Sequence, residues 1–205
     1  MPVPIIRPYR GSDREALYDI CVRTADAGGD ARGQLSTDRL WGDVFAVPYA
    51  VFGPHLTFVL DDGEGQAVGY VLGTSDTPGF ARRYREEWIP RLGDAYPALE
   101  GDSQTLEEQI LWCHWNPERM VVPELAAYPA HLHIDLLPDY QGRGFGRLLM
   151  ERLYAALAGD GAAAVHLEML DANTGARAFY DRLGFHEIAV PDVPGITFLG
   201  RSTTP

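Results

Sequence analysis

The feature that most constrains this chain is the segment 141–146, which has the sequence Gln-Gly-Arg-Gly-Phe-Gly. It lies between an alternating apolar run at 131–137 and a run with helical spacing over about 144–158. A turn from a strand into a helix leaves backbone N–H groups unpaired at the positive end of the helix dipole. Such a place binds phosphate, and glycines let the backbone approach the anion closely. The segment predicts a phosphate-binding turn in a mixed α/β protein.

Two common phosphate motifs do not fit this turn. A P-loop ends in Gly-Lys-Ser/Thr, but all 17 basic residues of this chain are arginine. The dinucleotide fingerprint needs G-x-G-x-x-G, whereas the turn has G-x-G-x-G. Arg143 and Arg147 add charge-assisted donors beside the turn. The alternative is that the glycines only make a tight strand-to-helix connection.

The rest of the chain alternates strand and helix patterns. A capping box of Ser12 and Glu15 is expected to start the first helix. Strand, helix and strand in the last third predict a right-handed crossover between parallel strands. The expected strands are 3–7, a hairpin of 56–60 and 67–74, 131–137, 165–169 and one from 185, and the later helices are about 144–158 and 174–183.

The middle of the chain, about 76–128, is richer in Pro, Trp and charge. Two helix faces are indicated there, the first by Tyr84, Trp88 and Leu92 and the second by Leu106, Ile110 and Cys113. We interpret the segment as a helical insertion in a single domain that spans residues 1–205.

Composition excludes several classes. A formal net charge of -12 argues against binding nucleic acid through its phosphates and tolerates a cationic substrate. No apolar stretch approaches the roughly 20 residues of a membrane helix, so a cytoplasmic protein without membrane contact is expected. Cys21 and Cys113 show no ligand spacing, which predicts no metal site and no disulfide framework.

The glycine-rich turn resembles the coenzyme A signature Gln/Arg-x-x-Gly-x-Gly/Ala of the GCN5-related N-acetyltransferases. The later segment 173–185, Asn-Thr-Gly-Ala-Arg-Ala-Phe-Tyr-Asp-Arg-Leu-Gly-Phe, is similar to that family's Asn, Phe-Tyr and Gly-Phe pattern. Both motifs have the family's order and separation over 131–190. The resemblance implies the fold of that family, a mixed and mostly antiparallel sheet flanked by helices.

A second likeness covers nearly the whole chain. The segments 6–9, 69–74, 88–90 and 134–135 resemble the acetyltransferase-like C-terminal domain of the animal O-GlcNAc hydrolase. That domain is regarded as a pseudo-acetyltransferase and lacks an intact glycine-rich turn. Because this sequence keeps the turn, cofactor binding is better supported here.

The resemblance implies a set of cosubstrate-binding residues. In the family, the end of the strand before the turn pairs its backbone with the pantetheine amides. Asn173 matches an asparagine that contacts the pantetheine arm, although it also has the place of a helix N-cap. Arg177 is expected either to contact phosphate or to lie solvated on its helix. The implied set is Leu136, Leu137, Gln141, Gly142, Arg143, Gly144, Phe145, Gly146, Arg147, Asn173 and Arg177.

Acetyl transfer to an amine needs an uncharged amine and an acid for the departing thiolate. By resemblance Tyr180 is that acid, and as a core aromatic it has a structural role as well. His131, His133 and Asp135 share one face of their strand. Asp135, or a water that it orders, is expected to be the base because it matches the aspartate of the animal domain, and His133 is the alternative.

These observations predict an acetyl-CoA-dependent N-acetyltransferase that works by direct attack of the amine in a ternary complex. The alternative is a catalytically silent acetyl-CoA-binding module for sensing or assembly. The amine acceptor is left open among a peptide amine, an aminosugar, an antibiotic and a polyamine. Many relatives pair as dimers, so a homodimer is compatible with the resemblance and the oligomeric state stays open.

Overall fold

The computed structural model describes residues 2–99, 101 and 104–204, and its centre is a seven-stranded sheet with the order β1-β2-β3-β4-β5-β7-β6. The sheet is antiparallel except between β4 and β5. This confirms the mixed, mostly antiparallel α/β fold expected from the sequence. The strands are β1 (Ile5–Pro8), β2 (Thr57–Asp61), β3 (Ala67–Thr74), β4 (Ala130–Leu136), β5 (Ala164–Leu170), β6 (His186–Ile188) and β7 (Ile196–Ser202).

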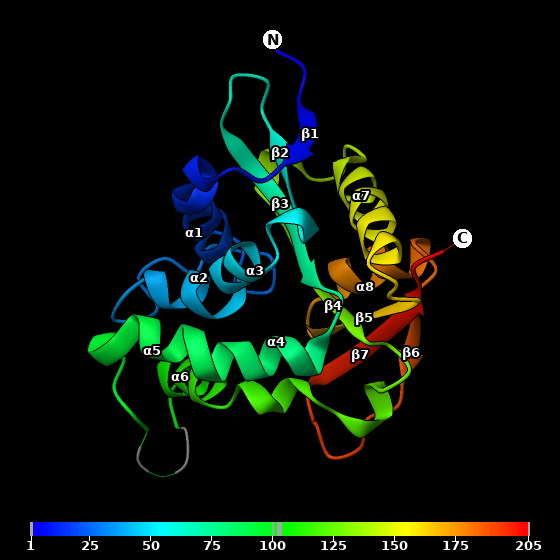
Figure 1. The fold of residues 1–205 in the computed structure, drawn as a ribbon. Coiled ribbons are helices and arrows are strands. Elements are labelled where there is room, and N and C mark those ends of the chain that lie inside the picture. The colour runs from blue at the N-terminus through cyan, green and yellow to red at the C-terminus, as the bar shows by residue number, and fades with distance from the viewer. Residues whose placement is uncertain (1, 100, 102–103, 205) are drawn as a thin grey trace.

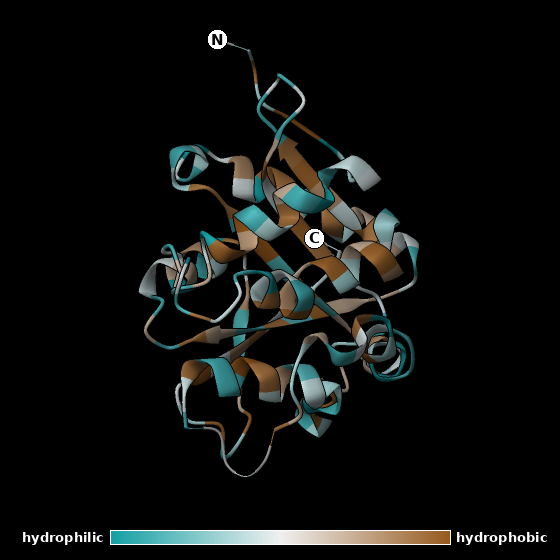
Figure 2. Ribbon diagram, turned by 90° about the vertical axis from the view of Figure 1, so that its left-hand side faces the viewer, coloured by the Kyte–Doolittle hydropathy of each residue, from teal (hydrophilic) through white to brown (hydrophobic). Residues whose placement is uncertain are grey.

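Helices cover both faces of the sheet. In Figure 1, α1 and α3 lie on one side of β3 and β4, and α7 lies on the other side. The helix ribbons carry both hydrophobic and hydrophilic segments (Figure 2), as amphipathic helices on a sheet do. The helices are α1 (Arg14–Val22), α2 (Arg39–Phe45), α3 (Val47–Phe52), α4 (Thr77–Arg83), α5 (Ile89–Leu92), α6 (Leu106–Trp115), α7 (Phe145–Gly159) and α8 (Thr174–Arg182).

The two parallel strands separate soon after they meet. β4 pairs with β5 only at Ala130↔Val165 and His131↔His166, whereas β4 pairs with β3 as far as Leu136. β5 instead pairs with β7 along its length. The expected crossover between parallel strands is therefore confirmed, and a gap opens in the sheet along the second half of β4.

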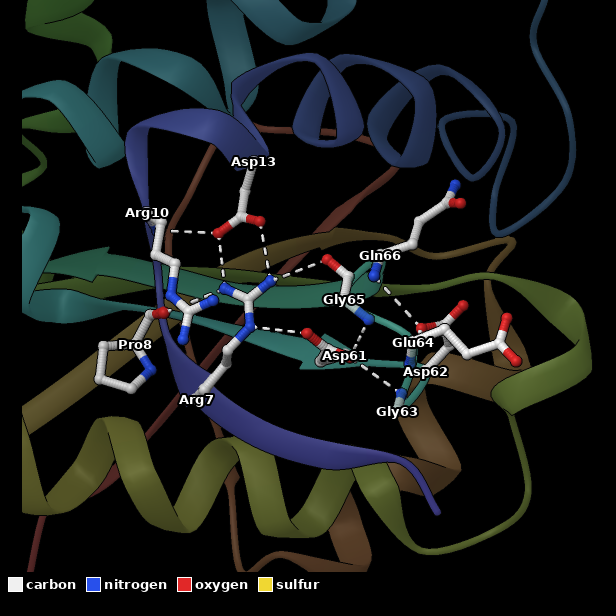
Figure 3. Close-up of polar contacts among 10 residues, drawn as sticks. All are labelled: Arg7, Pro8, Arg10, Asp13, Asp61, Asp62, Gly63, Glu64, Gly65 and Gln66. Carbon is white, nitrogen blue, oxygen red and sulfur yellow. Dashed lines mark hydrogen bonds and ion pairs between the residues drawn. The ribbon is translucent and has the colours of Figure 1, made fainter. Parts of the chain in front are cut away.

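A buried ion cluster lies at the β1 edge of the sheet (Figure 3). The Arg7 guanidinium donates to Asp61 Oδ2 at 2.7 Å and to both carboxylate oxygens of Asp13 at 2.7 and 2.8 Å. The other oxygen of Asp61 accepts from the backbone N–H groups of Gly63 and Gly65 in the hairpin loop. One arginine thus ties β1, the start of α1 and the β2–β3 loop together.

The predicted capping box of Ser12 and Glu15 is wrong. α1 begins at Arg14, after a 3-10 turn at Gly11–Asp13 that contains Ser12. The Asp13 carboxylate accepts the Arg10 backbone N–H at 2.7 Å, and it is held in place by Arg7. Asp13, which caps this 3-10 turn and pairs with Arg7, is therefore the residue that precedes the helix.

The middle segment is helical, as expected. A π-helical turn, Tyr84–Trp88, joins α4 to α5, and Tyr84 and Trp88 are buried. In α6 the face differs from the prediction, because Ile110 is buried but Leu106 is 40% exposed. Residues 100, 102 and 103 of the segment lie outside the described residues. The interpretation as an insertion in one domain stays a prediction.

The end of the chain holds one strand more than expected. The strand predicted from Phe185 is the short edge strand β6, and β7 follows it and lies between β5 and β6. β7 begins with the β-forming run Ile-Thr-Phe-Leu, so the sequence carried a local signal for this strand that the prediction did not use. Within the described part of the chain, no helix is both long and apolar enough to cross a membrane.

Candidate active site

A cavity of about 800 Å³ lies at the gap between β4 and β5. Its walls come from the end of β4, the glycine-rich turn, the start of α8 and the loop after α1. A volume of this size is in the range of cofactor-sized ligand sites. The residues expected from the sequence that line it are Asp135, Leu136, Gln141, Gly142, Gly144, Gly146, Arg147, Asn173 and Tyr180.

The glycine-rich turn is shaped for close approach of a ligand. Gly144 is the N-cap of α7 with φ of 86°, a left-handed backbone conformation that residues other than glycine rarely adopt. No atom lies within 4 Å of the place where a Cβ would stand, so the backbone is open on that side. A Cβ at Gly146 would lie 3.1 Å from the ring of Phe179 in α8. The first glycine thus exposes the helix start, and the second lets α7 and α8 approach each other.

The strand end and the turn are joined by a hydrogen bond. The side chain of Gln141 donates to the Leu136 carbonyl at 2.8 Å. Leu137 does not line the cavity, and its N–H donates to the Val68 carbonyl while its own carbonyl accepts from Tyr140. Its backbone is already used inside the protein, so this geometry does not support the expected pairing of Leu137 with a pantetheine amide.

The basic residues of the motif differ in position. Arg147 lines the cavity and pairs with Glu151 one turn further along α7, at 2.9 Å. Arg143 donates to the Asp139 carbonyl and lies over the Phe145 ring, 5.2 Å from its centroid, and neither Arg143 nor Phe145 lines the cavity. Arg147 is therefore the arginine of the turn placed to meet an anion.

The start of α8 completes the wall. Asn173 is its N-cap, because its Oδ1 accepts the Ala176 N–H at 3.0 Å. Its capping role does not remove it from the cavity, which it also lines. Arg177 points elsewhere and pairs with Asp181 and Glu187, as a surface arginine does.

Asp135 is a partly buried carboxylate at this cavity. Burial raises its pKa to about 6, although the hydrogen bond from Tyr70 lowers it in part. The Tyr70 hydroxyl donates to Asp135 Oδ2 at 2.6 Å. A carboxylate with a pKa near 6 accepts a proton far more readily than an ordinary aspartate, while it is still ionised at neutral pH.

Tyr180 is buried and packs edge-on against Phe179 and Phe185, with ring centroids 5.2 and 5.3 Å apart. Burial raises its pKa above the usual value, and the nearby Asp135 charge raises it further. Its hydroxyl therefore keeps its proton at neutral pH. The core interpretation of this residue is confirmed, and its role as the acid stays a prediction for a side chain that also borders the cavity.

The two histidines on the same face of β4 do not line this cavity. His131 is buried, His133 is partly buried, and both hydrogen-bond to the Tyr49 hydroxyl, at 2.7 and 3.1 Å. Burial lowers the pKa of His133 to about 4. The structure thus separates the two candidate bases, with Asp135 in the large cavity and His133 outside it.

Some residues of this cavity were not predicted from the sequence. Tyr70 was seen only as part of a strand, and its bond to Asp135 depends on the β3–β4 register. Thr24 and Gly28 follow α1 and carry no local signal. Arg182 lies in the recognised segment 173–185, but nothing in its type or spacing distinguishes it from a solvated arginine.

The residues present fit acetyl-CoA. The first-turn N–H groups of α7 lack intrahelical partners, and Gly144 leaves space beside them for phosphate oxygens. The gap along β4 leads from this turn to Asp135 and Tyr180, so a long thin ligand reaches both. A split mixed sheet with a glycine-rich helix start at the split defines an acetyl-CoA-dependent acetyltransferase.

Comparison with known proteins agrees with this class. Residues 109–187 match the family model described as an acetyltransferase (GNAT) domain. The solved structure of SsHAT is 58% identical, covers 100% of both chains and has a TM-score of 0.95. The chain belongs to the GCN5-related N-acetyltransferase family, which uses acetyl-CoA as cosubstrate.

Two curated relatives match different shares of the chain. Protein O-GlcNAcase of Rattus norvegicus is 29% identical over 201 residues, which are 96% of this chain. The chain spans 22% of that protein's length. Ribosomal protein bS18-alanine N-acetyltransferase of Haemophilus influenzae is 40% identical over 58 residues, 28% of this chain and 39% of the relative.

Proposed function

We propose that this chain binds acetyl-CoA along the glycine-rich turn and β4 and transfers its acetyl group to an amine by direct attack in a ternary complex. The observation that carries the proposal is the cavity that joins the start of α7 to Asp135 and Tyr180. The family match does not favour the catalytically silent module. The amine acceptor and pairing as a homodimer are separate proposals, and the shape of this cavity tests neither of them.

Three groups carry the proposed chemistry. The bound thioester supplies an activated acetyl group. Asp135, directly or through a water, takes a proton from the amine as its nitrogen bonds to the carbonyl carbon. Tyr180 gives its hydroxyl proton to the sulfur as the carbon–sulfur bond breaks. The raised pKa of Asp135 and that of Tyr180 suit these opposite tasks, because each group stands in the required protonation state at neutral pH.

The test compares two buried tyrosines. Tyr180→Phe is expected to lower the transfer rate about 100-fold or more while the acetyl-CoA dissociation constant changes less than about threefold. Tyr154→Phe is the matched control, because Tyr154 is buried, packs on Phe185 and does not line the cavity. Equal rates for the two variants contradict the role of Tyr180. Binding of acetyl-CoA without transfer to any amine of a broad panel contradicts the enzyme itself.

A further inference from the structure

A second, small cavity of about 30 Å³ borders the other half of β4. His131 and His133 line it, whereas Ile134, Asp135 and Leu136 line the large cavity. The two cavities therefore follow one another along the same strand, and the small one lies where β4 and β5 begin to separate. Its volume suits one or two waters or a small polar group.

The hydrogen bonds around this cavity fix the protons of both histidines. The Thr77 hydroxyl donates to the Pro129 carbonyl at 2.8 Å, so it accepts from Nδ1–H of His131, also at 2.8 Å. His131 Nε2 is then bare and accepts the Tyr49 hydroxyl proton. The Tyr49 oxygen in turn accepts from Nε2–H of His133 at 3.1 Å.

Because Nε2 of His133 donates to the Tyr49 oxygen, Nδ1 of the same ring is left as an acceptor. A neutral imidazole donates through one nitrogen and accepts through the other. Burial lowers the pKa of His133 to about 4, so the ring is uncharged at neutral pH. The cavity wall thus offers a lone pair, which suits an N–H group of an amine.

Opposite charges stand on the same wall. Arg119 Nη1 donates to Glu168 Oε1 at 3.1 Å, and both residues line the cavity. Arg119 Nε is buried and has no hydrogen-bond partner among the described residues. A buried guanidinium N–H without a partner costs free energy, and an oxyanion is the group that best satisfies it. Glu168 presents a carboxylate beside it, which attracts an ammonium group.

We propose that the small cavity binds the head of a small zwitterionic acceptor, an amine with a carboxylate on the neighbouring carbon, as in a free amino acid. Arg119 Nε binds the carboxylate, Glu168 attracts the ammonium form, and His133 accepts an N–H of the amine. The proposal rests on the proposed function and names its acceptor class. Asp135 is two residues from His133 on the same face of β4, roughly 7 Å along the strand, so a water relays the amine proton to the proposed base.

The test is a competition between matched acceptors. The protein and acetyl-CoA are incubated with an equimolar mixture of free amino acids, their decarboxylated amines, a polyamine and a short peptide, and acetylated products are measured by mass spectrometry. Amino acids are expected to exceed their decarboxylated partners by about 10- to 100-fold, the value of a charge-assisted hydrogen bond. Arg119→Gln is expected to reduce that preference to about threefold or less, with the KM for acetyl-CoA unchanged.

Two further variants keep the test decisive. Arg119→Lys keeps the charge and the fold and is expected to restore only part of the preference, because an ammonium lacks the Nε–H geometry. Arg85→Gln is the control for loss of an arginine–glutamate ion pair as such, since Arg85 pairs with Glu118 at the surface and does not line the cavity. The proposal is overturned if decarboxylated amines match the amino acids, if Arg119→Gln keeps the preference, or if only the polyamine or the peptide is acetylated.

The result also separates this proposal from the proposed function. Acetylation of the polyamine alone overturns the zwitterionic acceptor and leaves the enzyme in place. No product from any acceptor, with acetyl-CoA bound, contradicts the enzyme itself and the acceptor class with it. No binding of acetyl-CoA removes the proposed function and this inference together.

Discussion

Two carboxylate environments, one at the β1 edge of the sheet and one three strands away on β4, show how differently one fold treats the same side chain. In the Arg7 cluster, burial raises the pKa values of Asp13 and Asp61, but hydrogen bonds from Arg7 and from backbone N–H groups outweigh it and lower both. At Asp135, burial dominates and raises the pKa to about 6, since its neighbours are hydroxyls rather than cations.

The difference distinguishes carboxylates that stabilise the fold from a carboxylate that is available to a substrate. A carboxylate that already has an arginine gains nothing from a proton, so it holds the fold and does no acid-base chemistry. A carboxylate left with hydroxyl partners at a cavity is costly to the fold and available to a substrate proton. Four predictions test this comparison, in order of expected effect.

The largest effect is expected from removal of the Asp135 charge. Asp135→Asn should lower the transfer rate by about 10²- to 10⁴-fold, because no group at the cavity then accepts the amine proton. The free energy of unfolding at pH 7 should be unchanged or higher. Steady-state kinetics and urea unfolding measure the two quantities on one preparation, and His133→Gln is the comparison for the other candidate base. A large rate loss in His133→Gln together with an active Asp135→Asn would reverse the assignment.

The next effect is on the Arg7 cluster. Arg7→Met leaves two buried carboxylates without their cation and should lower the free energy of unfolding by about 3–5 kcal/mol. The matched control is Arg23→Met, which removes an exposed pair with Asp19 and should cost about 0.5 kcal/mol or less. The affinity of the folded protein for acetyl-CoA should not change. Equal losses in the two variants would show that the cluster is no more than a surface ion pair.

The pH dependence of stability should have opposite signs at the two sites. Asp13 and Asp61 bind protons less readily in the folded chain, so their contribution is present above their unfolded pKa and is lost as the pH falls below about 5. Asp135 binds its proton more readily when folded, so its ionisation lowers stability as the pH rises from about 4 to 6.

Urea unfolding of the wild type and Asp135→Asn between pH 4 and pH 7 shows whether ionisation of Asp135 lowers or raises the free energy of unfolding. The advantage of Asp135→Asn over the wild type should grow by on the order of 2 kcal/mol across that range. In Arg7→Met the loss of stability at acid pH should be smaller than in the wild type. A pH-independent difference between the wild type and Asp135→Asn would mean that the pKa of Asp135 is not raised.

The smallest effect is expected at the mouth of the cofactor cavity. Arg147→Gln should weaken acetyl-CoA binding by about 3- to 10-fold, because Arg147 is exposed and its charge is screened by salt. Arg152→Gln, on the same helix and outside the cavity lining, should leave the affinity unchanged. Titrations at low and high salt measure both, and the gap between the variants should narrow as salt is added. Equal acetyl-CoA affinities of the two variants at low salt would show that Arg147 does not contact the phosphates.

The parts that the sequence predicted are those with local causes. The turn at 141–146, α7 and β5 follow from residue types within a few positions, and α8 begins at Asn173 because an asparagine side chain caps the next turn. The coenzyme A motif predicts Gly144 and Gly146, and both lie at the split, Gly144 because its backbone is left-handed and Gly146 because a Cβ there would meet the Phe179 ring.

What the sequence could not supply depends on distant pairs. Tyr70 reaches Asp135 only through the β3–β4 register, and Arg7 meets Asp61 from 54 positions away. Arg119 joined the small cavity from a turn after α6 that no pattern connects to β4. Each of these contacts is decided by the assembled sheet, and none leaves a periodic signal. The start of α1 at Arg14 is a different case, since the contacts of Asp13 with Arg7 and Arg10 are local and the sequence analysis assigned the cap to Ser12 instead.

The most direct test of the account is calorimetric titration of the protein with acetyl-CoA and with free coenzyme A, beside three glycine variants. Gly144→Glu places a carboxylate at the helix start, and Gly175→Glu does so at the start of α8 without a left-handed backbone. Gly159→Glu adds the same charge at the far, exposed end of α7. We predict binding by the wild type and Gly159→Glu and loss of binding in Gly144→Glu and Gly175→Glu. Equal affinity in all four proteins, or no binding by the wild type, would contradict the placement of the cosubstrate on this turn.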